Sequence, residues 1–247
     1  MLSFFKKTSP TVSDYFPIQT DMHSHILPGI DDGSPDIETS LLLIKGLMEL
    51  GLKRSVATPH VISDVYRNTP ATIRAALQQL QSALAENNID YKVKAAAEYM
   101  MDAAFFEMIE KGEELLCIKD KTILTEFSFG SLPDNPRLMS FSIITAGYTP
   151  ILAHPERYAY FHGNPKAYHL LDELGFQLQV NLSSLTGYYG GHAEKAAKYI
   201  LKNKLCRYIG TDLHHVRHLE LLKKDRAIFE TVLEGARWNE SLNEAVS

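Results

Sequence analysis

Side chains that can bind metal ions recur along this chain, each close to the end of a run of residues typical of a β-strand. They occur in six separate segments of the sequence. The residues are Asp21, His23, His25, His60, Glu98, Glu126, His154, Asp212 and His214. They can meet in space only if the strands are parallel and share one carboxyl-terminal rim, which is where α/β barrels carry their chemistry. The recurrence therefore predicts a metal-dependent enzyme.

Spacing within the first and last segments favours metal binding over a purely structural role. His23 and His25 are two residues apart, so they share one face of an extended strand. A single histidine in such a place is more often a hydrogen-bonded core residue. Asp212 and His214 repeat the same spacing at another strand end, and this repetition favours the metal-ligand interpretation.

The middle segments leave more than one interpretation open. Glu98 follows an apolar run and is either an exposed rim residue or a carboxylate that bridges two ions. Glu126 ends a strand-like run that would bury its charge, which is costly without a partner, and His154 is in a similar position. The other histidines are in polar or helical contexts and are expected at the surface: His162, His169, His192, His215 and His218.

The mixture of ligands indicates which ions would bind. Imidazole and carboxylate together suit Mn, Fe or Zn, whereas a purely oxygen set would suit Mg or Ca. Five histidines and four carboxylates are more than the three or four protein ligands of one catalytic zinc. Two or three ions are therefore expected, bridged by Glu98 or Glu126. Neighbouring ions can hold a bridging hydroxide that acts as a nucleophile.

Length and composition exclude several functional classes. The 247 residues suffice for a single α/β barrel, and 45% of them are hydrophobic. A net charge of −5 argues against nucleic acid as a main partner, and no apolar run reaches the roughly 20 residues of a membrane span. Cys117 and Cys206 make no disulfide framework, and the start lacks the long apolar stretch of a signal peptide. We therefore expect a cytoplasmic protein.

Strand-like and helix-like segments alternate through the chain. Strands are expected near residues 19–23, 53–58, 92–97, 122–127, 150–154, 177–182 and 207–211. Helices are expected after the N-cap residues Ser34 and Thr69, and over 102–111, 136–147, 165–174, 192–203 and 216–236. This alternation is typical of right-handed βαβ units and a parallel sheet. Periodicity leaves open whether the sheet closes, but ligands drawn from the first strand through the last favour a barrel.

Taken together, these motifs resemble those of the polymerase-and-histidinol-phosphatase (PHP) superfamily. The run Asp-Met-His-Ser-His-Ile-Leu-Pro-Gly-Ile-Asp-Asp-Gly at 21–33 is similar to the signature of the bacterial capsule-type tyrosine phosphatases, the CpsB/YwqE/CapC group. The match continues in order with Thr58-Pro-His60, Ala97-Glu98-Tyr99, Leu152-Ala-His-Pro-Glu-Arg157 and Thr211-Asp-Leu-His214. It spans roughly residues 19–235, and the run at 21–33 is its most specific part.

The resemblance implies a distorted seven-stranded (β/α) barrel of the PHP type that holds three divalent metal ions. Mn is the first expectation, with Fe, Zn or Mg as alternatives. The implied ligands are His23, His25, Asp32, His60, Glu98, Glu126, His154, Asp212 and His214. The resemblance also implies that Arg157 binds phosphate, with Arg217 as the nearest candidate for a second phosphate-binding arginine. Asp32 is in addition a candidate for the general acid.

The resemblance further implies a substrate and a partner. The substrate would be phosphotyrosine on the tail of a bacterial tyrosine kinase of polysaccharide export, hydrolysed by direct attack of the metal-bridging hydroxide. Aromatic residues that could line the approach are Tyr66, Tyr99, Phe127, Tyr158 and Tyr188. The expected organisation is an arm over residues 1–18, a phosphatase domain over 19–236 and a tail over 237–247.

Two other functions remain open, and one is excluded. A PHP-type enzyme could instead hydrolyse a small phosphomonoester such as histidinol phosphate, or the protein could be a non-catalytic metal-binding regulator. A cysteine-based tyrosine phosphatase is excluded, because that chemistry needs an arginine six positions after the nucleophilic cysteine. The sixth residue after Cys117 is Ile123, and the sixth after Cys206 is Asp212.

Overall fold

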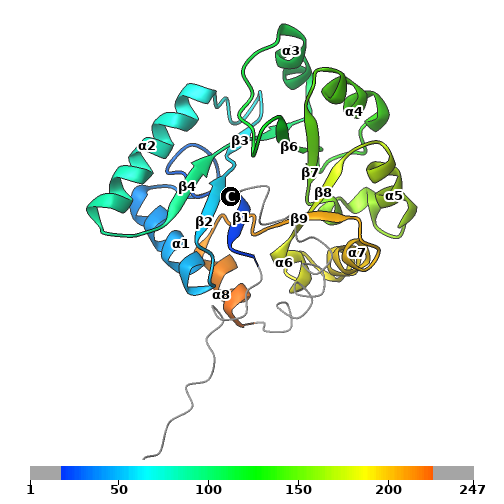
Figure 1. The fold of residues 1–247 in the computed structure, drawn as a ribbon. Helices are drawn as coiled ribbons and strands as arrows, with labels where there is room; N and C mark the ends of the chain where they lie inside the picture. The colour runs from blue at the N-terminus through cyan, green and yellow to red at the C-terminus, as the bar shows by residue number, and fades with distance from the viewer. Residues whose placement is uncertain (1–17, 225–247) are drawn as a thin grey trace, which may run out of the picture.

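The computed structural model describes residues 18–224, in which short parallel strands form a ring with helices around its outside (Figure 1). The expected tail, almost all of the expected arm and the second half of the last expected helix lie outside these residues. The strands are β1 Thr20–Ser24, β2 Arg54–Ala57, β3 His60–Val61, β4 Lys92–Ala95, β5 Glu98–Met100, β6 Thr122–Glu126, β7 Thr149–Ala153, β8 Gln177–Asn181 and β9 Cys206–Gly210.

Two parallel sheets make up the ring. One has the order β1-β2-β4 and the other β3-β5-β6-β7-β8-β9. On one side the chain itself joins the sheets, because it passes from β2 into β3 and from β4 into β5. On the other side, His25 N–H donates to the carbonyl of Leu213 at 2.9 Å, which connects β1 with the segment after β9. The prediction of an α/β fold with parallel strands is confirmed.

Two of the seven expected strands, 53–58 and 92–97, are each followed closely by a second short strand that was not expected. The chain path of β2 continues as β3 after Thr58 and Pro59, and the path of β4 continues as β5 after Ala96 and Ala97. Pro59 has no N–H to donate, so regular pairing is broken there. The continuation matters for function, because it pairs His60 on β3 directly with Glu98 on β5.

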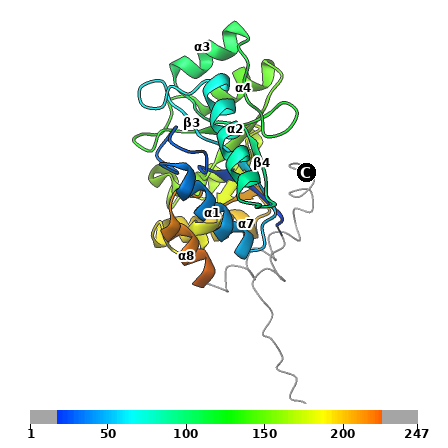
Figure 2. The same ribbon diagram turned by 90° about the vertical axis from the view of Figure 1, so that its left-hand side faces the viewer.

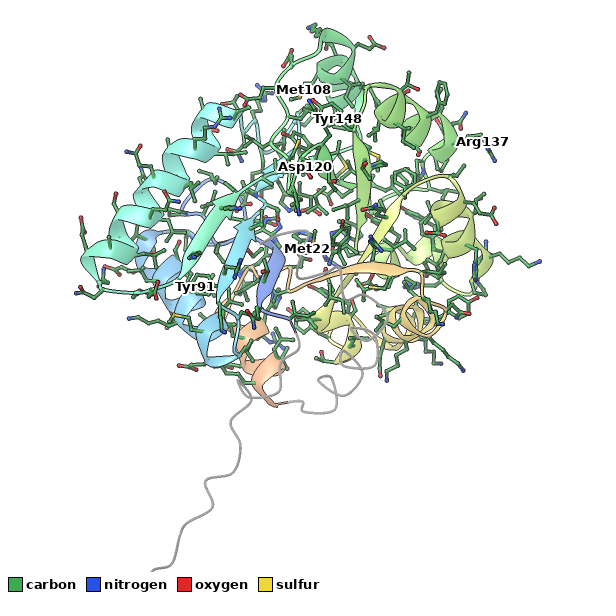
Figure 3. The ribbon with its side chains drawn as sticks, viewed as in Figure 1. Met22, Tyr91, Met108, Asp120, Arg137 and Tyr148 are labelled. Atoms are coloured by element: carbon green, nitrogen blue, oxygen red, sulfur yellow. The ribbon has the colours of Figure 1, made fainter. Side chains whose placement is uncertain are left out.

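Helices cover the outside of the ring, as the two views show (Figures 1 and 2). They are α1 Ile37–Glu49, α2 Pro70–Glu86, α3 Ala103–Lys111, α4 Pro136–Thr145, α5 Lys166–Glu173, α6 Leu182–Leu185, α7 Gly191–Lys202 and α8 Val216–Lys224. Met22 is buried at β1, one of the strands of the ring, whereas Arg137 on α4 points outward (Figure 3). Within residues 18–224, no helix has the length and apolar character needed to cross a bilayer.

One of the two expected helix caps is wrong. The first helix is capped by Asp36, whose Oδ1 accepts a hydrogen bond from Thr39 N–H at 2.7 Å. Ser34 is buried instead and donates its hydroxyl to the carbonyl of Asp36. Thr69 is the N-cap of α2, as expected, and forms a reciprocal capping box with Thr72.

Candidate metal centre

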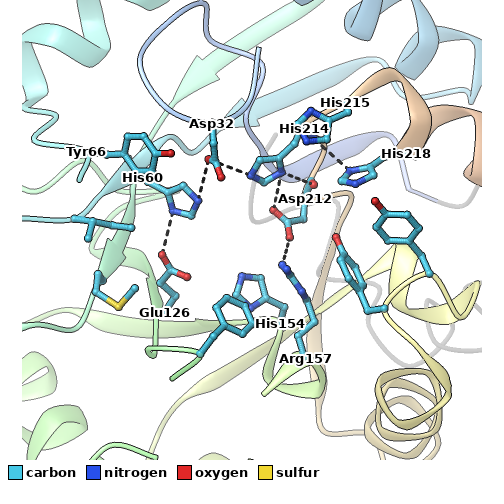
Figure 4. Close-up of a pocket in the computed structure, with 15 residues that line it drawn as sticks. Asp32, His60, Tyr66, Glu126, His154, Arg157, Asp212, His214, His215 and His218 are labelled. Atoms are coloured by element: carbon cyan, nitrogen blue, oxygen red, sulfur yellow. Dashed lines mark hydrogen bonds and ion pairs between the residues drawn. The ribbon is translucent and has the colours of Figure 1, made fainter. Parts of the chain in front are cut away.

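The nine ligands that the resemblance implies lie together at the carboxyl-terminal end of the ring (Figure 4 shows those that line the pocket). Their ligand atoms form four groups, and within each group the atoms lie within 4.8 Å of one another. The groups are His25, Asp32, His60 and His214; His23, His154 and Asp212; His23, His25 and Glu98; and His60, Glu98 and Glu126. His23, His25, His60 and Glu98 each belong to two groups, so the nine residues make one continuous cluster. Asp21, a candidate from its spacing alone, is in none of these groups and accepts a hydrogen bond from Thr211 N–H instead.

Short distances between ligand atoms mark the centre of this cluster. Nε2 of His23 lies 3.2 Å from Nε2 of His25 and 3.3 Å from Oε2 of Glu98. Nδ1 of His60 lies 3.1 Å from the same glutamate oxygen and 3.0 Å from Oε1 of Glu126. Glu98 therefore touches both the β1 histidines and the His60–Glu126 pair, which is the position of a bridging carboxylate.

Three of the central atoms test whether these residues fit metal ions. His60 Nδ1, Glu98 Oε2 and Glu126 Oε1 are buried, and none has a hydrogen-bond partner among the described residues. Buried polar atoms are costly when unpaired, and most such atoms in proteins are satisfied. The three atoms lie close together but do not hydrogen-bond to one another. Ligand atoms that share a cation are arranged in this way. A mixed nitrogen and oxygen set of this kind fits divalent transition metals.

The charged side chains of the cluster shift one another's pKa values. Burial and repulsion from Glu98 raise the pKa of Glu126 to about 7. Burial lowers the pKa of His23, but the negative charges of Glu98 and Asp212 outweigh it and raise the pKa to about 9. Despite burial, His23 and His60 hold the pKa of Glu98 well below its usual range. Without metal, an ionised Glu98 is thus paired with a protonated His23, whereas Glu126 takes up a proton near neutral pH.

Asp31 is a functional candidate that the sequence analysis missed. Its Oδ2 lies 2.8 Å from Nδ1 of His25, and its Oδ1 accepts a hydrogen bond from Gly33 N–H. A carboxylate on the second ring nitrogen fixes the orientation of a metal-binding histidine. The neighbouring Asp32 is half-exposed, and its Oδ1 lies 3.5 Å from Nε2 of both His60 and His214. In the sequence, the two adjacent aspartates Asp31 and Asp32 were the signal that could have identified Asp31.

Arg157 lies beside the cluster and is held on several sides. It ends the short 3-10 helix Pro155–Arg157 that follows β7, and its Nη1 donates to Oδ2 of Asp212 at 2.6 Å. Its guanidinium carbon lies 4.8 Å from the centre of the Phe129 ring and 4.1 Å from that of Tyr189. Cation–π contacts of this kind orient a guanidinium without neutralising it.

Arg217 has a different environment from the one expected. Its side chain is exposed and is not among the residues that line the pocket beside the cluster. His218, expected at the surface, is instead buried and lines that pocket. Because α8 begins at Val216, adjacent residues point about 100° apart around the helix. The predicted contact of Arg217 with phosphate has no support in this arrangement.

The pocket beside the cluster has a volume of about 380 Å³ and several aromatic walls. Tyr66 and Tyr188 line it, in agreement with expectation, and Phe129 and Tyr189 line it as well. The other aromatic residues named from the sequence are buried in the core: Tyr99, Phe127 and Tyr158. Aromatic rings thus surround the approach to the candidate ligands and to Arg157.

Comparisons with known proteins identify similar chains among tyrosine-protein phosphatases. Tyrosine-protein phosphatase YwqE of Bacillus subtilis (strain 168) is 31% identical over 198 residues, which is 80% of this chain and 78% of the relative. Tyrosine-protein phosphatase CpsB of Streptococcus pneumoniae is 27% identical over 203 residues, covering 79% of this chain and 83% of the relative.

Solved structures match the fold. One match comes from the crystal structures of YwqE from Bacillus subtilis and CpsB from Streptococcus pneumoniae, which are described as metal-dependent tyrosine phosphatases. Its TM-score is 0.77 and its sequence identity is 28%. The match covers 92% of this chain and 95% of the matched chain. A histidinol phosphate phosphatase from Lactococcus lactis shares the fold, with a TM-score of 0.54 and 15% identity, covering 89% of this chain and 92% of its own length. The family model for capsular polysaccharide synthesis, CpsB/CapC, matches residues 19–226, and the chain belongs to that family.

Proposed function

We propose that this protein is a metal-dependent protein-tyrosine phosphatase. The observation that carries the proposal is that six of the nine cluster residues and Arg157 line one pocket of about 380 Å³. The tyrosine phosphatases among its relatives supply the substrate class. In the same pocket, aromatic walls suit the ring of a phosphotyrosine side chain.

The four ligand groups share residues in a way that suits three ions per chain, and we propose Mn as the first candidate, with Fe, Zn or Mg as alternatives. When bound, such ions act as Lewis acids and lower the pKa of water enough to make a nucleophile at neutral pH. The protein's own part is to hold the ligands apart from bulk water. His23, His25 and Glu98 are fully buried for this purpose, whereas His60 and Asp32 lie closer to the pocket opening.

Arg157 would orient the phosphoryl group and offset charge on its non-bridging oxygens. Its planar fork can meet two phosphate oxygens at once, which a lysine ammonium cannot do. A phenolate leaving group has a pKa near 10, so it departs with less protonation than an alkoxide. The residues of the site therefore need no strong general acid. Asp32 is half-exposed at the pocket, but its hydrogen bond with His214 holds the pKa of its carboxyl well below the usual range, so an ionised Asp32 would be a poor proton donor.

The physiological substrate would be a phosphotyrosine-containing protein. We propose the tail of a bacterial tyrosine kinase of polysaccharide export, because the family to which the chain belongs is named for capsular polysaccharide synthesis. We also propose a cytoplasmic location, because two cysteines in 247 residues make no disulfide framework, as is typical of proteins from a reducing compartment.

A second candidate is a phosphatase for a small phosphomonoester. The pocket volume of about 380 Å³ lies within the range of small-molecule sites. Purified protein with Mn should be assayed on a phosphotyrosine peptide, a phosphoserine peptide and histidinol phosphate. Fast hydrolysis of the phosphotyrosine peptide alone is the expected result. A preference for histidinol phosphate would favour the second candidate, and metal binding without turnover on any substrate would indicate a regulatory protein.

A further inference from the structure

Two amide side chains on β8 connect ligands that come from different strands. Nδ1 of His23 lies 2.9 Å from Oε1 of Gln179, and Gln179 Nε2 donates to Oδ1 of Asn181 at 2.8 Å. Asn181 Nδ2 in turn donates to Oδ2 of Asp212 at 2.6 Å. All four side chains are buried. Gln179 and Asn181 are absent from the candidate ligand groups, yet they join His23 and Asp212 of one group.

The carboxylate of Asp212 determines the direction of each hydrogen bond in the series from His23 through Gln179 and Asn181 to Asp212. An ionised carboxylate only accepts hydrogen bonds, so Asn181 must turn its amide nitrogen toward Asp212. Its oxygen then faces Gln179 and requires the amide nitrogen of that residue. Gln179 is left with its oxygen toward His23, where it also accepts from His154 N–H at 3.3 Å. His23 must therefore carry a proton on Nδ1, which leaves Nε2 for the cluster.

A glycine makes room for this connection. Gln179 is on β8, His23 is on β1, and β9 runs between these two strands. Gly210 on β9 pairs with Asn181. A Cβ atom on Gly210 would lie 2.6 Å from Cβ of His23 and 3.1 Å from Nε2 of Gln179. Because Gly210 has no side chain, Gln179 reaches across β9 to the histidine.

We propose that Gln179 and Asn181 are positioning residues, which fix the tautomer of His23 and the orientation of Asp212 for metal binding. Arg157 shares Oδ2 of Asp212 with Asn181. When Arg157 turns toward a phosphate, the hydrogen bond from Asn181 keeps the carboxylate in place. Strand β8 thus supports the metal site without supplying a candidate ligand to it. The inference rests on the metal site of the proposed function, but on no particular substrate.

The test is a titration of metal-stripped protein with Mn alone. Gln179→Met keeps the side-chain length and removes all three hydrogen bonds, to His23, Asn181 and His154. It should weaken Mn binding by about 10- to 100-fold, as loss of a partner behind a ligand typically does. Gln179→Glu keeps the acceptor for His23 and should retain more of the affinity than Gln179→Met. The matched control is Gln177→Met on the same strand, because Oε1 of Gln177 has no hydrogen-bond partner within residues 18–224. This control should bind Mn normally.

A spectroscopic readout separates positioning from general damage. In the zinc-loaded protein, imidazole ¹⁵N shifts should show the proton of His23 on Nδ1, and Gln179→Met should lose this signature while circular dichroism stays unchanged. If Gln179→Met does not fold, Asn181→Ala breaks the next link and should weaken Mn binding at least about tenfold.

The outcomes distinguish this proposal from the proposed function. Unchanged Mn affinity in a folded Gln179→Met or Asn181→Ala protein would overturn the positioning role and leave the phosphatase proposal intact. Weakened Mn binding in Gln179→Met, with normal binding in Gln177→Met, would support the role even if the unsubstituted protein hydrolysed no phosphotyrosine.

Discussion

Arg157 and Asp212 form a direct ion pair, with Nη1 of the arginine 2.6 Å from Oδ2 of the aspartate. The other oxygen of Asp212, Oδ1, faces the histidines of β1, at 3.3 Å from His23 and 3.4 Å from His25. One carboxylate therefore joins the candidate phosphate-binding arginine to the candidate metal ligands. A phosphate bound at Arg157 would be held next to the ions.

Arg157→Ala should lower turnover by roughly 10²-fold or more, because it removes a donor aimed at charge that develops in the transition state. Metal content should stay the same, since Asn181 and the β1 histidines still hold Asp212. Arg157→Lys restores the charge but not the fork, and should recover only part of the rate. The measurements are kcat and elemental analysis, with Arg137→Ala on the outer surface as control. Full turnover in Arg157→Ala would assign the phosphate contact to another residue.

Removal of metal should abolish activity and lower stability. Elemental analysis of the purified protein should find two or more ions per chain, and chelation should remove them together with turnover. His60→Ala and Glu126→Ala should each lower metal content with the fold intact, because both residues lie at the rim rather than in the barrel core. Added Mn at about 100 times its Kd should stabilise the metal-stripped protein by about 2.7 kcal/mol. A metal-free protein that remains fully active would contradict the metal-dependent mechanism.

The fold and the main ligands were predictable because both leave a periodic trace in the sequence. Parallel strands buried on both faces read as short apolar runs, and their ends mark the rim. His154 and Glu126, for example, each directly follow such a run or end it. The match of strand ends to ligand types therefore predicts where the candidate ligands gather.

Other parts of the site depend on contacts that a sequence does not reveal. Gln179 and Asn181 are neutral amides on a buried strand, and their roles follow from hydrogen bonds to residues far along the chain. The places of Arg217 and His218 depend on where α8 begins, because one residue changes the direction of a side chain by about 100°. Phe129 has the sequence appearance of an ordinary apolar residue, and only its contact with Arg157 identifies it.

Metal binding should release protons and strengthen as the pH rises. In the metal-free protein the pKa of His23 is raised to about 9, so its imidazole is protonated at pH 7. An ion must displace that proton, so Mn affinity should rise between pH 6 and 9, by up to about tenfold per unit for each proton released. The rise of the His23 pKa from 6.5 to about 9 also stabilises the metal-free fold. This stabilisation is fully present below pH 6.5 and is lost as the pH rises through about 9. Calorimetric enthalpies that do not depend on the buffer would contradict proton release.

Phosphotyrosine peptides should be hydrolysed much faster than phosphoserine or phosphothreonine peptides. A phenolate leaves with little protonation, and the longer aromatic side chain brings its phosphate further into the recessed cluster. The comparison is of kcat/KM for peptides that share a sequence and differ only in the phosphorylated residue. Equal values would leave a general phosphomonoesterase without preference for tyrosine.

Phe129 should contribute to this preference. Its ring lies over the guanidinium of Arg157 and stacks on His154 at 5.5 Å, and 46% of its surface is exposed at the pocket. An added aromatic ring from the substrate could pack against that exposed face, and such pairs are worth roughly 0.5–1.5 kcal/mol. Phe129→Ala should therefore lower kcat/KM for a phosphotyrosine peptide by about two- to twelvefold with metal content unchanged. Phe141→Ala on α4 is the matched control, since Phe141 is exposed outside the pocket. If both variants retain the rate of the unsubstituted protein, Phe129 is no part of the substrate-binding wall.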